Sequence, residues 1–482
     1  MLNLPARLHF SFVLSALLLW PHSAWSDVLV RWSNQAVIPL DKFGISDLVF
    51  PGSASDAVLR SARKNGYHVY IETDAADSTA AAEKAERDDC AGLVIAAHQA
   101  ERAQVEAVIA PLRAARPKLK FLILNRDGKQ PDMRGSLVIQ RNSVLEVSSP
   151  TAQPWIDTNL AMIKIEQRAD PRGMPFYSFS WTSEDFSTHT AVDYALAVAE
   201  AGAFHAGVVV DLGERLQESL IESDQKAWTL WNEVRSYADF YAQAAPNLVA
   251  AANLLLVADS LDVTEESMNL LARHNIPFRV LLPADLKSAE LSDYAMMVVL
   301  AKPDKDAAED IAAFAARGKT VVVVDAHGSY AWQKSGVVEV NEHTKSYGVG
   351  SGKVLELSEP VIDPETFAQD IRRVMGNQNM LINLWNGLTT VAVPYRERGP
   401  DGGAGKVKVV EFVNYSTDPI HLQVQVKGDF ASIRFDAPGR SCCEMLTPVK
   451  HGAFTEFVIP DLRIAGRVYL EERARTESQT KK

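Results

Sequence analysis

The sequence predicts a multidomain α/β protein with a (β/α)8 barrel, a second α/β domain and a small antiparallel β-sandwich, in that order. Three observations support this. Short apolar runs alternate with helical patterns in the first half, a second such series follows from Asn253, and beyond Asn379 strand patterns are divided by turn signals such as Pro400-Asp401-Gly402-Gly403. A length of 482 residues with 47% hydrophobic content suits about three packed cores.

Residues 1–26 have the features of a secretory signal peptide. Arg7 precedes an apolar run from Phe10 to Trp20, and Ala24-Trp25-Ser26 supplies a small-residue cleavage pattern. The run is shorter than the roughly 20 residues that a membrane-spanning helix needs. We therefore expect an exported protein, periplasmic or extracellular, whose mature chain starts near Asp27 and has no membrane attachment. An uncleaved anchor is the alternative.

The charge and cysteine content limit the possible partners and cross-links. Lys and Arg total 49 against 61 Asp and Glu, a net charge of −12, so a phosphate backbone is repelled and no nucleic-acid partner is expected. Cys90, Cys442 and Cys443 are too few for a disulfide framework. Adjacent cysteines rarely bridge, and the sequence leaves open whether Cys90 pairs with Cys442 or Cys443.

Residues 27–246 contain eight apolar runs that predict the parallel strands of a barrel. They are "VLVRW" from Val28, "DLVF" from Asp47, "HVYIE" from His68, "GLVIA" from Gly92, "FLILN" from Phe121, "SLVIQ" from Ser136, "FYSFSW" from Phe176 and "GVVVD" from Gly207. Helical patterns lie between most of them. An open doubly wound sheet is the alternative. The long connection after the sixth run carries Trp155, Asp157, Asn159 and Glu166, and a long irregular segment usually has a function.

Residues 247–378 predict a flavodoxin-like or glutamine-amidotransferase-like α/β domain. The range contains no cysteine, so it lacks the nucleophile of an amidotransferase. The stretch "YGVGSGKVLEL" is not a phosphate loop, because Tyr347 stands where the first glycine is needed and Val354 follows the lysine. We expect no cofactor. Residues 379–474 predict the sandwich, and 475–482 a charged, disordered tail.

This order of domains is similar to that of secreted glycoside hydrolases of the β-galactosidase type. The segments "VVEFVNYSTDPIHLQVQVKGDFASIRFDAPG" and "FVIPDLRIAGRVYLEE" resemble the C-terminal sandwich of such enzymes. The resemblance implies a carbohydrate substrate or ligand and a homo-oligomer assembled through the middle domain. It also implies one glutamate after the fourth barrel strand, usually preceded by asparagine, and another after the seventh.

Glu184 and Asp185 follow the seventh predicted strand and suit the role of nucleophile or base. The fourth strand is followed by "AAHQAE", which has no Asn-Glu pair. Other carboxylates at strand ends could supply the acid, although each also has a structural interpretation as a cap, a turn or a solvated charge. They are Glu72, Asp74, Asp127, Asp211 and Glu214.

The catalytic candidates are therefore Glu184, Asp185, Glu72, Asp74 and Asp211, and the substrate-binding candidates are Trp181, Trp155, Asp127, Asn159 and Glu214. Trp155 and Trp181 could stack on sugar rings or close the barrel mouth. His98, His189 and His205 lack the spacing of metal ligands, so no metal is expected. Two functions remain open: a glycoside hydrolase, and a non-catalytic binding or assembly protein on a decayed hydrolase scaffold.

Overall fold

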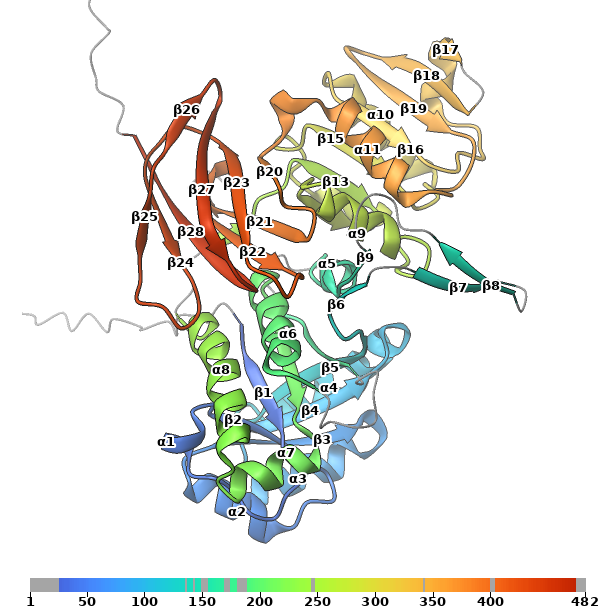
Figure 1. Cartoon of the computed structure of the whole chain (residues 1–482). Helices are drawn as coiled ribbons and strands as arrows, with labels where there is room; N and C mark the ends of the chain where they lie inside the picture. Colours follow the sequence, from blue (N-terminus) through green and yellow to red (C-terminus); the bar gives the residue numbers. More distant parts are fainter. Residues whose placement is uncertain are drawn as a thin grey trace, which may run out of the picture.

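The structure is a computed structural model and describes residues 26–134, 137–141, 144–148, 155–168, 174–179, 189–243, 248–340, 343–398 and 404–473. It has three parts, with the barrel at the bottom of Figure 1, the middle domain at the upper right and the sandwich at the upper left. The segment predicted as a signal peptide lies outside these residues, apart from Ser26. Within them, no helix combines the length and apolar character needed to cross a membrane.

The first part is a closed barrel of parallel strands, so the open-sheet alternative is wrong. Its described strands, in ring order, are β1 (Val28–Arg31), β11 (Gly207–Asp211), β10 (Phe176–Phe179), β5 (Lys120–Gly128), β4 (Gly92–Ala97), β3 (His68–Asp74) and β2 (Asp47–Pro51). Each strand contributes one residue to a cluster of buried side chains, which are Leu29, Val209, Phe176, Leu124, Val94, Tyr70 and Val49. The barrel is therefore a packed core rather than a pore.

The sixth predicted strand does not enter the barrel. Residues Leu137–Arg141 form β7, which pairs antiparallel with β8 (Val144–Ser148) in a separate hairpin. β5 pairs directly with β10, so the described ring has seven strands. An apolar run indicates that a segment can form a strand but does not determine its partner. Figure 1 shows the hairpin beside the middle domain, away from the ring.

The barrel helices that cover the strands are α2 (Asp56–Lys64), α3 (Ser78–Arg87), α4 (Arg102–Ala115), α6 (Ala191–Ala203), α7 (Gly213–Ile221) and α8 (Gln225–Tyr241), with a short α1 (Leu40–Phe43) before β2. Trp231 of α8 is buried and stacks on Phe43, with ring centroids 4.4 Å apart. Between β5 and β10, β6 (Asp132–Arg134) pairs with β9 (Trp155–Asp157), and α5 (Leu160–Glu166) follows.

The middle domain contains a mixed sheet of seven strands. In spatial order they are β14 (Phe278–Leu281), β13 (Leu254–Val257), β15 (Met296–Val299), β16 (Thr320–Val323), β19 (Gly352–Leu357), β18 (Thr344–Val349) and β17 (Val337–Val340), and the first five are parallel. Alternate strand residues pack with α9 (Glu265–Arg273) and α11 (Pro364–Met375) on one face and with α10 (Lys305–Ala316) on the other. Burial of both faces explains why the central strands β13 and β15 are continuously apolar.

The third part is a sandwich of two antiparallel sheets around a shared apolar core. One sheet contains β12 (Leu248–Ala250), β21 (Thr390–Arg398), β22 (Ala404–Asn414), β28 (Ala465–Glu472), β24 (Phe430–Asp436) and β25 (Glu444–Leu446). The other contains β20 (Ile382–Trp385), β23 (Ile420–Lys427), β27 (Phe454–Leu462) and β26 (Val449–His451). β12 falls within residues 247–378, yet it pairs with β21 of this sheet.

Buried polar contacts join the sandwich to the barrel. Tyr415, just after β22, donates a hydrogen bond of 2.7 Å to Glu200 of α6, and Tyr395 donates one of 2.8 Å to the Ala203 carbonyl. Arg467 of β28 lies 4.5 Å from the ring centroid of Phe240 in α8. Burial raises the pKa of Glu200, and its hydrogen bonds oppose that shift. These contacts hold the sandwich against α6 and α8 of the barrel.

Lys164 of α5 lies where all three parts meet. It lines an apolar cavity of about 30 Å³ together with Ala250 of the sandwich strand β12 and Phe278 of the middle domain. Its Nζ is 3.5 Å from Gln167 Oε1. Burial lowers the pKa of Lys164 from 10.5 to about 8. The ammonium group is therefore less stable in the folded chain than in the unfolded chain.

Replacing Lys164 by methionine is expected to stabilise the protein at pH 7 by about 2 kcal/mol. Burying a charged lysine lowers the free energy of unfolding. For Lys164 this loss is largest below about pH 8 and disappears as the pH rises to 10.5. The gain from Lys164→Met should therefore shrink over this interval. Urea unfolding of both proteins at pH 7 and pH 10 measures it. Lys226→Met, at an exposed site on α8, is the control, and an equal gain there would refute the explanation.

Candidate active site

Polar side chains gather at one edge of the barrel because its strands are parallel and their C-terminal ends meet there. The register places Arg31 beside Asp211, Glu72 beside Val94, and Ala97 beside Asn125. The edge therefore brings together charged residues that are far apart in the sequence. This is the face on which barrel enzymes build their sites.

Arg31, at the end of β1, binds two candidate carboxylates. Its Nε and Nη2 donate to the two oxygens of Glu72 at 2.8 and 2.9 Å, and its Nη1 donates to Asp211 at 3.2 Å. Burial lowers the pKa of Arg31, but the hydrogen bonds and charges of Glu72 and Asp211 outweigh burial and raise it. Arg31 therefore holds both oxygens of the Glu72 carboxylate in one bidentate contact.

Asp74, Asp211 and Glu214 have different surroundings. Asp74 is 3.3 Å from Arg126, which is also 3.8 Å from Glu72. Asp211 accepts a further hydrogen bond of 2.9 Å from the amide of Gly213, the first residue of α7, but the N-cap of this helix is Leu212, so Asp211 is not its cap. Glu214 is exposed in the first turn of α7.

A histidine and an aspartate form a second cluster at the ends of β4 and β5. His98 Nδ1 lies 2.5 Å from Asp127 Oδ1, and the Gln99 amide donates to Asp127 Oδ2 at 2.7 Å. The hydrogen bond that His98 makes to the Asp127 carboxylate, together with the charge of that carboxylate, raises the pKa of His98. From the sequence, His98 was weighed only as a metal ligand. Its position directly after a strand, next to a strand ending in Asp127, is the signal that could have identified the pair.

The side chain of Glu166 in α5 is buried, and both of its carboxylate oxygens accept hydrogen bonds. Asn125 donates to it at 2.6 Å and Arg102 at 2.5 Å. Burial raises the pKa of Glu166, whereas the charge of Arg102 and both hydrogen bonds lower it. Asn125 also donates to Gln99 at 2.9 Å. Glu166 thus fixes side chains beneath the edge of the barrel.

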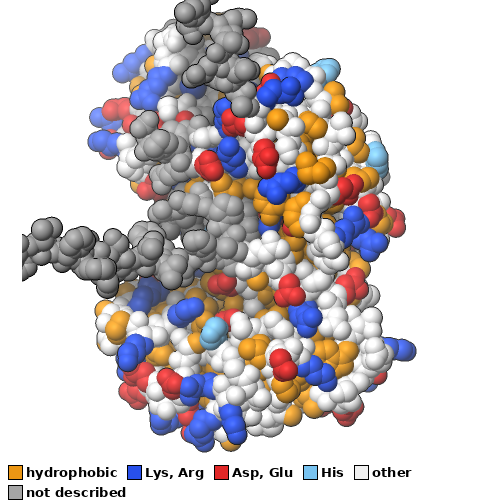
Figure 2. Space-filling model, turned by 90° about the vertical axis from the view of Figure 1, so that its left-hand side faces the viewer, with side chains coloured by type: hydrophobic (Ala, Val, Ile, Leu, Met, Phe, Trp, Pro, Cys, Tyr) orange, Lys and Arg blue, Asp and Glu red, His pale blue; other side chains and the backbone are white. Residues whose placement is uncertain are grey.

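A cavity of about 570 Å³ lies between this edge and the middle domain. Its lining includes His98, Asp127, Lys129, Asn159, Asp259, Asp262 and Glu265. Two of these lining residues form an ion pair, in which Lys129 Nζ lies 2.6 Å from Glu265 Oε1. On the face shown in Figure 2, Lys and Arg side chains are mixed with Asp and Glu. The cavity offers charged donors and acceptors in a volume typical of a small-molecule site.

Asn159 and Trp155 take part in structural contacts near the cavity. Asn159 is buried, accepts a hydrogen bond of 2.7 Å from the Lys129 amide and donates one of 2.6 Å to Glu200. Trp155 is partly buried, packs against the large apolar cluster that the barrel shares with the other two parts, and donates to Asp157 at 3.3 Å. Trp181, Glu184 and Asp185 lie outside the described residues.

The whole chain resembles a solved glycoside hydrolase in structure. α-L-Fucosidase isoenzyme 2 from Paenibacillus thiaminolyticus matches with a TM-score of 0.57 and 11% identity, covering 93% of this chain and 100% of that one. The chain therefore has a glycoside-hydrolase-like fold. A β-galactosidase from Bacillus circulans sp. alkalophilus matches with a TM-score of 0.40, 9% identity and coverage of 86% and 66%.

The exo-β-1,4-mannosidase Op5Man5 from Opitutaceae bacterium strain TAV5 matches with a TM-score of 0.43 and 11% identity, covering 72% of this chain and 93% of that one. No protein-family model matches the sequence, and no curated protein does. At these identities the likeness shows the fold alone, so the chemistry must be argued from the site.

Proposed function

We propose that this chain is an exported glycoside hydrolase that uses a carboxylate pair at the C-terminal edge of its barrel. The observation that carries the proposal is the contact of Arg31 with Glu72 and Asp211 at this edge, in a glycoside-hydrolase-like fold. Glycoside hydrolysis needs one carboxylic acid and one carboxylate on either side of the scissile bond.

The contact with Arg31 suggests which role Glu72 plays. Because the guanidinium binds both of its oxygens, Glu72 is suited to be the nucleophile or base rather than the proton donor. The proton donor would then be Glu184 or Asp185, which follow β10 in the sequence. This assignment reverses the roles expected from the sequence, in which Glu184 suited the nucleophile and a residue such as Glu72 the acid.

The cavity beside the edge would bind the sugar. Asp127, Lys129 and Glu265 present charged groups to it that can hydrogen-bond to hydroxyls. Asn159 would orient this wall through its contact with Lys129. Trp155 and Trp181 are proposed to supply apolar contacts to the sugar face. Asp74 and Asp211 are weaker candidates for a catalytic role, and Glu214 is a weaker candidate for sugar binding.

A non-catalytic sugar-binding protein is the second candidate, and a specific observation favours it. Among the described carboxylates at strand ends, Glu72, Asp74 and Asp211 each lie within 3.3 Å of an arginine. A site whose carboxylates all serve in ion pairs could bind a polar ligand without turning it over.

For the middle domain we propose a flavodoxin-like or glutamine-amidotransferase-like fold without amidotransferase activity, used for homo-oligomer assembly. Its five parallel strands, numbered along the chain, have the spatial order 2-1-3-4-5 of flavodoxin-like sheets, which supports the first part. The absence of cysteine from residues 247–378 supports the second.

Hydrolysis and binding measured on the same panel separate the two functions. Purified protein is incubated with aryl glycosides, including α-L-fucosides, β-galactosides and β-mannosides, and the corresponding free sugars are titrated by calorimetry. A hydrolase releases the aryl group from at least one substrate at a rate proportional to enzyme concentration. Binding without release supports the second candidate, and neither binding nor release contradicts both.

A further inference from the structure

We propose that a cavity at the end of the sandwich away from the barrel binds an acidic oligosaccharide, one whose sugar rings carry carboxylates as uronic acids do. The cavity has a volume of about 680 Å³. Its charged lining residues are four basic side chains and two carboxylates: Lys406, Lys427, Lys450, Arg473, Asp429 and Glu472. The chain as a whole has a net charge of −12, so the balance of charge in this cavity is the reverse of the overall balance.

Strand direction brings these residues to one end of the sandwich. β22 runs toward Tyr415, which contacts the barrel, so its first residues lie at the far end. β28 is antiparallel to β22 and ends there, where Lys406 Nζ lies 2.6 Å from Glu472. β24 begins with Phe430 opposite Glu472, and β23 ends with Lys427. The cavity is therefore built from strand ends of both sheets (Figure 1).

Positive charge exceeds negative charge in the cavity because each carboxylate is shared by two basic side chains. The ion pairs are those of Glu472 with Lys406 at 2.6 Å and Lys408 at 3.7 Å, and of Asp429 with Arg473 at 3.4 Å and Lys450 at 3.6 Å. Lys427 instead donates to the Gln378 carbonyl at 2.7 Å. An added anion at this end would thus meet net attraction.

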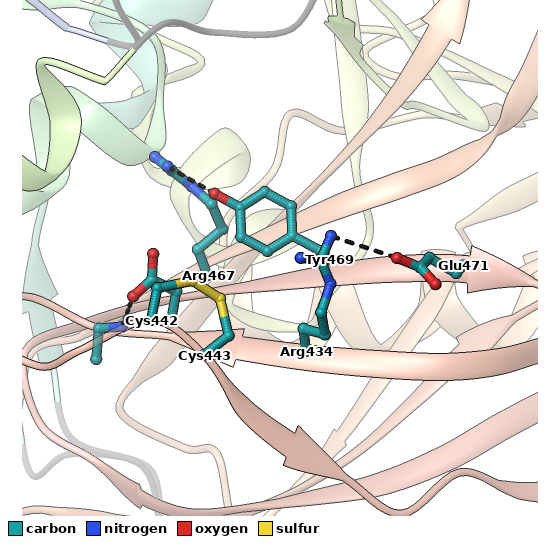
Figure 3. Close-up of a disulfide and its surroundings, with 8 residues drawn as sticks. Arg434, Cys442, Cys443, Arg467, Tyr469 and Glu471 are labelled. Carbon is teal, nitrogen blue, oxygen red and sulfur yellow. Dashed lines mark hydrogen bonds and ion pairs between the residues drawn. A yellow bond between two sulfur atoms is a disulfide. The ribbon is translucent and has the colours of Figure 1, made fainter.

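This surplus is not a general feature of the sheet. Arg434 of β24 lies 3.3 Å from Glu471 of β28, and Figure 3 shows this pair, in which one arginine meets one carboxylate. Glu471 and Glu472 are neighbours on β28, whose successive side chains point to opposite faces. The two lysines beside Glu472 therefore belong to a different surface from the balanced pair.

The cysteines of the chain are not among the described residues that line the cavity. Cys442 and Cys443 are joined as a disulfide between neighbouring residues (Figure 3), and Cys90 is a free, buried thiol. The expectation that adjacent cysteines do not bridge is therefore wrong here, and the pairing of Cys90 left open by the sequence is settled against it. Binding to the cavity can be measured without a reductant.

The placement of the basic residues favours carboxylates spaced along a sugar chain over a single phosphate. The cations come from four separate strand ends or turns, whereas a phosphate is usually held by donors that converge on one point. A lysine acts as a point charge and does not require a planar partner. The cavity is also large enough for a molecule rather than an ion, and a nucleic-acid backbone would be repelled by the net charge of the chain.

Calorimetric titration of the full-length chain with tetragalacturonate tests the proposal, which does not depend on hydrolysis at the barrel edge. We expect saturable binding that weakens as salt is added, because exposed charges are screened. Lys427→Gln/Lys450→Gln should weaken binding roughly tenfold. Asp429→Asn removes an opposing charge and should strengthen binding about threefold, a gain that a folding defect cannot imitate.

Two comparisons separate this cavity from general electrostatics and from other anions. Lys64→Gln/Lys118→Gln removes the same charge from exposed positions on the barrel and should leave the affinity unchanged. Methyl-esterified tetragalacturonate keeps the sugar rings without their charges and should not bind, and inorganic phosphate and a short polyphosphate should bind more weakly than tetragalacturonate. No binding of tetragalacturonate, equal losses in the two double variants, or tighter binding of either phosphate probe would overturn the proposal.

Discussion

Arg467→Met is expected to destabilise the protein by about 3–5 kcal/mol, because it leaves the carboxylate of Glu411 buried without its partner. The side chains of Arg467 and Glu411 are both 0% exposed and hydrogen-bonded to each other. Arg467 also lies over the rings of Phe240 and Tyr241, so the substitution removes a contact between sandwich and barrel. Burial raises the pKa of Glu411, and Arg467 opposes that shift.

Urea unfolding followed by tryptophan fluorescence measures the loss. Arg434→Met is the matched control, because Arg434 pairs with Glu471 at 3.3 Å while both side chains remain more than 40% exposed. An exposed pair contributes about 1 kcal/mol or less. The double variant Arg467→Met/Glu411→Leu should recover much of the stability. Equal losses in the two single variants would contradict the account of the buried pair.

The barrel strands could be predicted from the sequence because each of them is buried on both faces and therefore reads as an apolar run. Seven of the eight predicted runs form the ring, from β1 to β11. The run from Ser136 was misplaced because β7 has the same local pattern but pairs with β8. Which strands pair with one another depends on contacts between residues that are far apart in the sequence, and a short stretch of sequence does not contain those contacts.

The candidate site was harder to predict, because it too depends on contacts between residues that are far apart in the sequence. Glu72 and Asp211 were identified as polar residues at the ends of apolar strands, but Arg31 was not, although it also ends its strand. Its importance comes from partners 41 and 180 residues away in the sequence. Likewise, Glu200 was overlooked within an apolar helix pattern, and only the fold brings Tyr415 and Asn159 to it.

Glu72→Gln is expected to lower kcat/KM for the best aryl glycoside by about 10³-fold, since an amide can neither attack the anomeric carbon nor accept a proton. The amide still accepts one hydrogen bond from Arg31, so binding of the sugar should change much less than turnover. Initial rates and a calorimetric Kd measure the two effects. Glu218→Gln makes the same chemical change at an exposed position on α7 and should keep the wild-type rate.

The proposed carboxylate pair is tested most directly by initial rates of wild type, Glu72→Gln, Glu184→Gln and Asp185→Asn on one aryl glycoside, with folding checked by circular dichroism. We expect Glu72→Gln and one of the other two variants to lose most turnover, while the remaining variant keeps most of it. Full wild-type rates in Glu72→Gln, or in both Glu184→Gln and Asp185→Asn, would contradict the proposed carboxylate pair.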